Sequence, residues 1–248
     1  MRFSPTINGI ALETFNAKMQ SYPVISSCAV DTEVFQGVNR SSFQLLKNRR
    51  GARTMQFTVD FFGENTVRSR NQSALEALFL RGTAELDIGD GYFYRAALTG
   101  IQDPETLGEC VTSVTYTLRA TRHTEEIVIA AEPNGKPVFC VSNVPRTDCE
   151  IYLSKEKWLG GTSILITLNT VQRWSLAEAL TGDLLLDGIR KRFLMQNADG
   201  TWANITSRME WTEFPYLSPG DNLLGVSVSG GPSLSGRYAE ITYTPTYL

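Results

Sequence analysis

The sequence predicts a mainly β protein built in two parts. Apolar and polar residues alternate with a period of two along several segments, which is typical of strands with one face in a core. Glycine-containing turns separate many of these segments. One convincing segment, near residues 67–81, has the spacing of an amphipathic helix instead. We therefore expect a β protein in which a single helix interrupts the strands.

The first part is expected to contain two long strands, the helix and a hairpin. Residues 53–60 alternate apolar side chains with threonine and glutamine, and residues 111–119 repeat the pattern. Gly82 is well placed to end the helix. Gly89-Asp90-Gly91 separates two apolar runs and predicts a hairpin, because glycine tolerates positive φ. The residues expected to face the core are Met55, Phe57, Val59, Val114, Tyr116 and Leu118 on the strands and Ala74, Leu75, Leu78 and Phe79 on the helix.

A joint between the two parts is predicted around Pro133 and Pro137. The two prolines enclose an Asn-Gly pair, and this combination resists continuation of either a helix or a strand. We therefore expect residues 1–132 to form an N-terminal β domain with the helix near 67–81. Residues 133–248 are expected to form the second domain.

The second part is predicted to consist of strands and turns. Residues 163–168 are expected to form a buried strand, and residues 223–228 and 238–243 the last two strands. Residues 175–180 fit either a short helix or a loop. Short strands at this spacing indicate a β-sandwich.

Three turns in this part carry their own signals. Asp187-Gly188 and Asp199-Gly200 stand between apolar runs, which favours hairpins with type I′ turns. Pro219-Gly220 suits the central positions of a type II turn, because proline fixes the first φ and glycine accepts the positive second φ.

Composition limits the classes of function. Hydrophobic residues make up 42% and charged residues 20%, so the chain can bury a core, and its net charge of −3 gives no general attraction to nucleic acid or anionic lipid. Its four cysteines include no C-x-x-C pair, and no disulfide or zinc site is expected. One dense basic run is interpreted as a solvated loop, with phosphate binding as the alternative. That run comprises Lys47, Arg49, Arg50 and Arg53.

The usual signatures of catalysis are missing from the sequence. His123 is the single histidine, and neither a nucleophile motif nor a phosphate-binding glycine loop occurs. Glu178, Asp183 and Asp187 cluster in the second part and leave open a glycoside hydrolase with a carboxylate pair. Acids beside glycine are more typical of turns. We expect no enzyme, no catalytic residue, no cofactor and no metal.

All four tryptophans fall in the second part: Trp158, Trp174, Trp202 and Trp211. Indole rings fill cores and interfaces, and they also stack against sugar rings. Trp202 and Trp211 are the candidate ligand-binding residues. The alternative function is therefore a carbohydrate-binding module or adhesion protein that uses its C-terminal sandwich.

Four features occur in order near the end of the chain: L-L-L-D-G at residues 184–188, N-A-D-G at 197–200, F-P-Y-L-S-P-G-D-N at 214–222 and I-T-Y-T-P-T-Y at 241–247. This order resembles the C-terminal domain of the phage distal tail (Dit) family. Residues 53–62 resemble a strand of that family's first domain, and residues 75–79 lie where its helix is expected. The resemblance covers most of the chain, apart from about the first thirty residues.

The resemblance implies a structural role and a galectin-like C-terminal sandwich. Such proteins form a hexameric ring at the tail tip, or baseplate, of a siphophage or prophage. The N-terminal domain builds the ring, partly through a β-hairpin passed to a neighbour. The implied partners are other copies of the chain, the tail tube protein, the tail lysin or fibre protein, and a receptor-binding protein or host surface glycan. DNA only passes through the lumen, and no membrane is involved.

The implied location is the tail tip of the virion. Residues 1–10 are not followed by an apolar stretch of the length that an export signal needs. We therefore expect a soluble chain made in the cytoplasm of the host bacterium.

Overall fold

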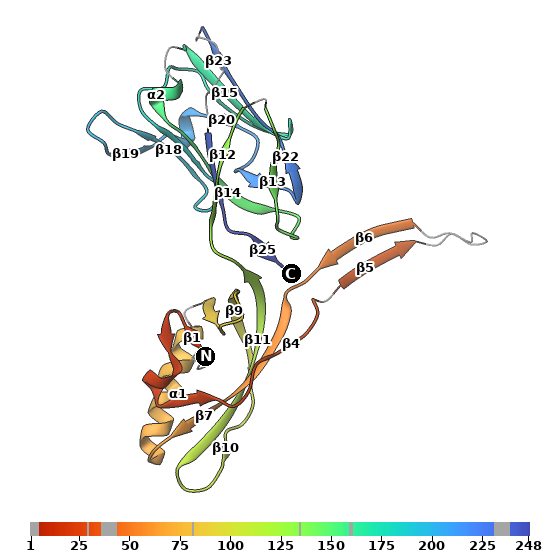
Figure 1. The fold of residues 1–248 in the computed structure, drawn as a ribbon, viewed down its shortest axis with the longest axis vertical. Helices are drawn as coiled ribbons and strands as arrows, with labels where there is room; N and C mark the ends of the chain where they lie inside the picture. Colours follow the sequence, from red (N-terminus) through yellow and green to blue (C-terminus); the bar gives the residue numbers. More distant parts are fainter. Residues whose placement is uncertain are drawn as a thin grey trace, which may run out of the picture. The chain divides into compact units, whose positions relative to one another are not determined.

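A computed structural model describes residues 5–28, 30–35, 44–80, 82–133, 135–158, 161–230 and 239–248, and the side chains at 30–35, 44–50 and 157–158 lie outside the description (Figure 1). The chain divides into two compact units, Met1–Thr124 with Tyr247–Leu248, and Glu125–Thr246. This division lies before the predicted joint, because strand β12 (Ile127–Ala131) pairs with β24 (Ala239–Tyr243) of the second unit. Within the described residues, no helix is long and apolar enough to cross a bilayer.

The first unit is a mainly antiparallel sheet with one α-helix. The described sheet runs in the order β2-β1-β8-β9-β11-β7-β3, with β4 beside β7 and β10 beside β11. Its strands are β1 (Thr6–Ile7), β2 (Ile10–Ala11), β3 (Ala17–Met19), β4 (Val24–Ile25), β7 (Arg53–Phe62), β8 (Ala84–Asp87), β9 (Phe93–Ile101), β10 (Glu105–Thr106) and β11 (Val111–His123). Its helices are the 3₁₀ turn η1 (Leu12–Phe15) and α1 (Asn65–Leu80).

The two long strands of this sheet follow the predicted alternation. β7 and β11 pair along ten positions, from Arg53↔Ala120 to Phe62↔Val111. All six residues predicted to face the core from these strands are buried, which confirms the period-two interpretation. The opposite face carries half-buried polar residues, among them Thr58 and Thr115, whose hydroxyls lie 2.8 Å apart.

The helix and the hairpin of the first unit are also confirmed. α1 buries Leu75 and Phe79, and Leu78 packs partly against the same core. Ala74 is exposed, so its assignment to the core face was wrong. Gly82 has a φ of +121°, as expected of a residue that ends a helix. β8 and β9 pair as the hairpin around Gly89-Asp90-Gly91, with Asp87 opposite Phe93.

Strands β5 (Val30–Phe35) and β6 (Gln44–Arg50) form a separate two-stranded sheet. The basic run predicted as a loop therefore lies in strands, with Lys47 in β6 and Arg53 at the start of β7. The register sets Asp31 opposite Arg49 and Glu33 opposite Lys47. Acidic positions thus face basic ones along this ribbon, and the run does not form a uniformly basic strand pair.

The second unit holds two sheets around one hydrophobic core. One sheet runs β12-β24-β14-β17-β18-β19 with β21 beside β14, the other runs β20-β16-β15-β23, and β13 pairs with β22. The core draws on both sheets, with Ile151 and Leu186 from the first and Ile166 and Trp174 from the second. The remaining strands of this unit are β13 (Val138–Cys140), β14 (Thr147–Leu153), β15 (Ser163–Leu168), β16 (Gln172–Leu176), β17 (Leu184–Asp187), β18 (Arg192–Gln196), β19 (Trp202–Asn204), β20 (Glu210–Trp211), β21 (Tyr216–Leu217), β22 (Gly220–Asn222) and β23 (Leu224–Ser229). The last strand of the chain, β25 (Thr246–Tyr247), pairs with β11 in the sheet of the first unit. The short helices are α2 (Lys155–Trp158) and η2 (Thr206–Arg208).

The strand predictions for this unit hold, and two other details do not. Residues 163–168 form β15, with its alternate residues buried, and β23 and β24 lie where the last two strands were expected. The stretch 175–180 begins within β16, so the short-helix alternative was wrong. Neither Asp-Gly turn is of type I′, which needs positive φ at two successive residues. At the first turn Lys191 alone has positive φ, and at the second Gly200 alone.

The turn after β17 explains why aspartate and glycine stand together there. Asp187 is fully buried, and its carboxylate accepts hydrogen bonds from Arg190 N at 2.7 Å and Arg192 Nε at 3.1 Å. Gly188 lies so close to the neighbouring chain that a Cβ would stand 2.1 Å from the Pro215 carbonyl oxygen. The turn therefore needs a carboxylate at one position and the absence of a side chain at the next.

Candidate functional site

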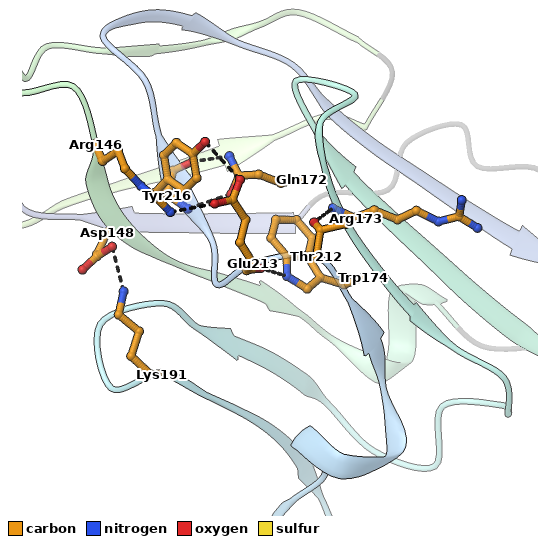
Figure 2. Close-up of polar contacts among 9 residues, drawn as sticks. All are labelled: Arg146, Asp148, Gln172, Arg173, Trp174, Lys191, Thr212, Glu213 and Tyr216. Atoms are coloured by element: carbon orange, nitrogen blue, oxygen red, sulfur yellow. Dashed lines mark hydrogen bonds and ion pairs between the residues drawn. The ribbon is translucent and has the colours of Figure 1, made fainter.

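A surface groove of the second unit is formed around residues 211–214. The segment that follows β20 lies along β16 and is held there by side-chain hydrogen bonds (Figure 2). Arg173 N donates to Thr212 Oγ1 at 3.0 Å, and Trp174 Nε1 donates to the Glu213 carbonyl at 2.7 Å. Because Trp174 is fully buried, its indole fixes this segment to the core as well as filling it.

Gln172 of β16 attaches the next part of the same segment, at Tyr216. Its buried side chain donates to the Tyr216 carbonyl at 2.8 Å and accepts from Tyr216 N at 3.0 Å. The amide of Gln172 thus pairs with the backbone of Tyr216 as a neighbouring strand would, because its NH₂ group donates and its oxygen accepts. The segment from Thr212 to Tyr216 is therefore rigidly placed before any ligand is considered.

One charged cluster of the groove is centred on Glu213. Arg146 Nη2 donates to Glu213 Oε2 at 2.9 Å, and the Tyr216 hydroxyl donates to Glu213 Oε1 at 3.1 Å (Figure 2). The Arg146 guanidinium also stacks 3.7 Å from the centre of the Tyr216 ring. Burial, and then the hydrogen bond to Glu213, raise the pKa of Tyr216, so its hydroxyl stays protonated and donates.

The second charged pair joins Lys191 and Asp148. Lys191 Nζ lies 2.8 Å from Asp148 Oδ1 and 5.8 Å from the centre of the Phe214 ring. Lys191 adopts the left-handed conformation with φ +56°, which is unfavourable for a residue with a Cβ. Its side chain lines the groove together with Asp148 and Phe214.

Trp211 forms the aromatic wall of the groove. Its ring packs on Phe214 with 4.6 Å between centroids and meets Phe193 edge-on at 5.8 Å. The side chain nevertheless remains 42% exposed. A hollow of about 620 Å³ is lined by Arg146, Asp148, Lys191, Trp211, Thr212, Glu213 and Phe214, and we call it the Trp211 groove. A smaller hollow of about 180 Å³ adjoins Trp211 and Thr212 and is completed by Arg173, Ser175 and Glu210.

The two tryptophans singled out from the sequence have different environments. Trp202 is also 42% exposed, but it lies on β19 in the other sheet and lines neither hollow at Trp211. Trp174 belongs to the core, and the side chain of Trp158 lies outside the described residues. Sequence reasoning missed the polar residues of the groove. The dense W-T-E-F-P-Y stretch at residues 211–216 was the available signal.

The acidic residues considered for a carboxylate pair have structural partners. Glu178 forms an ion pair with Arg208, and Asp183 accepts a hydrogen bond from the Tyr152 hydroxyl at 2.5 Å. Burial, and then this hydrogen bond, raise the pKa of Tyr152 to about 12. Asp187 is enclosed in its turn, as described above. Among the described residues, no group of three or more His, Cys, Asp or Glu side chains is arranged to hold a metal ion.

The first unit carries a separate hollow along its edge strand β3. The hollow measures about 820 Å³, and its lining includes Lys18, Met19, Gln20 and Tyr22. In the described sheet β3 pairs with β7 on one side and ends the sheet order on the other. We call this hollow the β3 groove. A groove beside an edge strand offers both backbone hydrogen bonds and side-chain contacts to an added strand.

No family model and no curated protein matches this sequence. Solved structures do match over the full chain. The SPP1 Dit protein, described as a paradigm of the hub adsorption apparatus in phages that infect Gram-positive bacteria, matches with a TM-score of 0.70 at 14% identity over 100% of both chains. A chain of the phage p2 baseplate in its activated conformation with Sr matches with a TM-score of 0.55 at 10% identity over 98% of both chains. The corresponding structure with Ca gives 0.55 and 10% over 99% of this chain and 98% of that chain.

These matches confirm the predicted resemblance at the level of the fold. The whole chain, with both of its units, has the mainly β fold of the SPP1 Dit hub protein and of the phage p2 baseplate chains. The galectin-like character of the second unit stays a prediction.

Proposed function

We propose that this chain is a structural subunit of the tail tip of a siphophage or prophage. The observation that carries the proposal is the end-to-end match to the SPP1 Dit hub, which spans both units rather than one common β domain. A chain whose two units together share the fold of one hub protein is expected to serve as a hub. In this proposal the protein has no enzymatic role.

The proposed assembly is a ring of six copies. The described sheet of the first unit ends in β2 on one side and β3 on the other, so it has two different edges. Contact between two different surfaces is heterologous, and a repeated heterologous contact closes into a ring when its rotation divides the circle. The β3 groove gives one of these edges a recess into which a neighbour's strand can fit.

The ribbon β5–β6 supports the same assembly. An isolated two-stranded hairpin is at best marginally stable in water, and this ribbon shares no ladder with the main sheet in the described residues. It runs into β7 through only Gly51 and Ala52, so its base is tied to the sheet. We infer that it is stabilised by packing on a neighbouring copy and contributes to ring closure.

The proposed ring links the tail tube to the tail fibre or lysin protein and carries receptor-binding proteins. DNA passes through its lumen without being recognised, and the assembled protein resides at the tip of the virion tail. In this arrangement the first unit builds the ring, and the second unit is the part available to further partners.

Light scattering of the purified chain after size exclusion tests the ring. We expect a mass near six times 27.5 kDa. Replacing residues 30–50 by a short Gly-Ser linker removes the ribbon and is expected to give a smaller species. Trp202→Ala is the control, because this exposed side chain of the second unit should not affect assembly. A monomeric mass for the unmodified chain, or an unchanged ring without the ribbon, contradicts this account.

A further inference from the structure

The Trp211 groove has a polar lining whose charges balance. Arg146 is paired with Glu213 at 2.9 Å and Lys191 with Asp148 at 2.8 Å, so two cations and two anions border the groove. All four side chains are partly exposed, between 30% and 54% of their area. They can therefore contact a ligand while the hydrophobic core stays packed.

The aromatic wall of the groove is fixed before any ligand arrives. Phe214 and Phe193 support the Trp211 ring from within, and Phe193 is fully buried. The remaining 42% of Trp211 is exposed and lies between the two hollows. A flat, rigid indole loses little conformational freedom when a ligand stacks on it, because its orientation is already set.

We propose that the Trp211 groove binds a neutral saccharide, with a sugar ring stacked on Trp211 and its hydroxyls bonded by the two ion pairs. Carboxylates accept hydrogen bonds from hydroxyls, while guanidinium and ammonium groups donate to them, so one polyhydroxy ligand satisfies both kinds of group. The hollow of about 620 Å³ is open to solvent and has room for a sugar ring on the exposed face of Trp211.

Charge balance distinguishes this ligand from others. A polyanion would be attracted by Arg146 and Lys191, yet each cation already has a carboxylate at hydrogen-bond distance. Glu213 lies beside Arg146, and Asp148 lies beside Lys191, so both would repel the polyanion. An uncharged ligand avoids this repulsion and leaves both pairs intact. The inference goes beyond the proposed hub role, since a ring subunit and a monomer would both present this groove.

A glycan array of neutral and acidic oligosaccharides, probed with the full-length protein, tests the proposal. The neutral glycan with the strongest signal is then titrated against three proteins: the unmodified chain, Trp211→Ala and Trp202→Ala. The two tryptophans are equally exposed, which makes Trp202 a matched control outside the groove. We expect Trp211→Ala to weaken binding by about tenfold or more, as is usual for a central aromatic contact, and Trp202→Ala to leave it unchanged.

A second variant keeps the test decisive if Trp211→Ala disturbs folding. Glu213→Gln preserves the side-chain shape and is expected to weaken saccharide binding while leaving the near-ultraviolet circular dichroism of the buried Trp174 intact. The proposal is overturned if no neutral glycan binds, if only acidic glycans bind, or if the Trp202 variant loses affinity as much as the groove variants do. The last outcome would indicate a site elsewhere on the second unit.

Discussion

The turn at Asn222 gives the sharpest test of how the second unit is held together. Asn222 is fully buried, and its amide Nδ2 donates to the carbonyls of Ser218 and Gly220, both at 2.8 Å. Its Oδ1 accepts from Ser218 N at 2.9 Å and from Asn169 Nδ2 at 2.8 Å. Gly220 has a φ of +86°, as a type II turn requires at that position. One side chain therefore satisfies both ends of the turn.

Asn222→Ala removes this side chain from three backbone groups. They are the N–H and carbonyl of Ser218 and the carbonyl of Gly220. Both residues are half-buried, so water can replace part of what is lost. We take the low end of the usual range, about 1 kcal/mol per group, which lowers the free energy of unfolding by about 3 kcal/mol.

Urea denaturation followed by tryptophan fluorescence measures this loss of stability in the second unit. All four tryptophans belong to the second unit, so their emission does not report the first. With a slope of about 2 kcal/mol per molar urea, the midpoint should fall by about 1.5 M. Asp221→Ala, an exposed neighbour in the same strand, should shift it by less than about 0.3 M. Equal midpoints for the Asn222 variant and the unmodified chain would refute the assignment of this side chain as the centre of the turn.

Three further predictions concern Gly188, Lys191 and Glu150 of the second unit. Gly188→Ala places a Cβ against the Pro215 carbonyl oxygen and should destabilise the second unit by at least about 1–3 kcal/mol in the same urea assay. An unchanged midpoint would contradict the close approach of Gly188 to the Pro215 carbonyl. Lys191→Gly removes the strain of a side chain on a left-handed backbone, so the free energy of unfolding should stay within about 1 kcal/mol of that of the unmodified chain. Saccharide titration should show weaker binding. A large loss of stability with intact binding would contradict this prediction. Burial, and then the nearby charge of Asp187, raise the pKa of Glu150 in the folded protein. A raised carboxyl pKa contributes stability at low pH, and this contribution is lost as the pH rises through the folded-state pKa. Glu150→Gln should therefore raise the urea midpoint at pH 7 and raise it less at pH 4. The opposite order would contradict the direction of the pKa shift.

Local patterns predicted those elements whose burial follows a simple period. The alternation in residues 53–60 and 111–119 became β7 and β11, because each strand has one face on a core and one on the surface. The helix and the hairpin around Gly89 and Gly91 were likewise found, since apolar spacing and glycine each act within a few residues. Ala74 shows the limit, because a small apolar residue at the edge of a helical stripe can face water without much loss.

Turn geometry depends on contacts that the local sequence does not contain. The Asp187-Gly188 pair was expected to form a two-residue turn, yet Asp187 stays in its strand and uses its carboxylate to bond Arg190 N. Gly188 is required by the approach of Pro215, which is distant in the chain. The positive φ falls on Lys191 instead. Tertiary packing thus overrode the turn that the dipeptide favours.

Of the residues that line the Trp211 groove, only Trp211 was predicted from the sequence. Trp211 was singled out by residue type, but Arg146, Lys191 and Glu213 come from separate segments. Strand β14 brings these segments together, because it pairs with β17 on one side and with β21 at its start. That pairing cannot be derived from spacing within any one segment.

Negative-stain electron microscopy of the purified full chain tests the central claim most directly. If the chain is a tail-tip hub subunit, the particles should be closed rings with sixfold symmetry and an open centre. Variants of the second unit such as Trp202→Ala should give the same rings. A field of discrete monomers at micromolar concentration, or open filaments of no fixed length, would contradict the account.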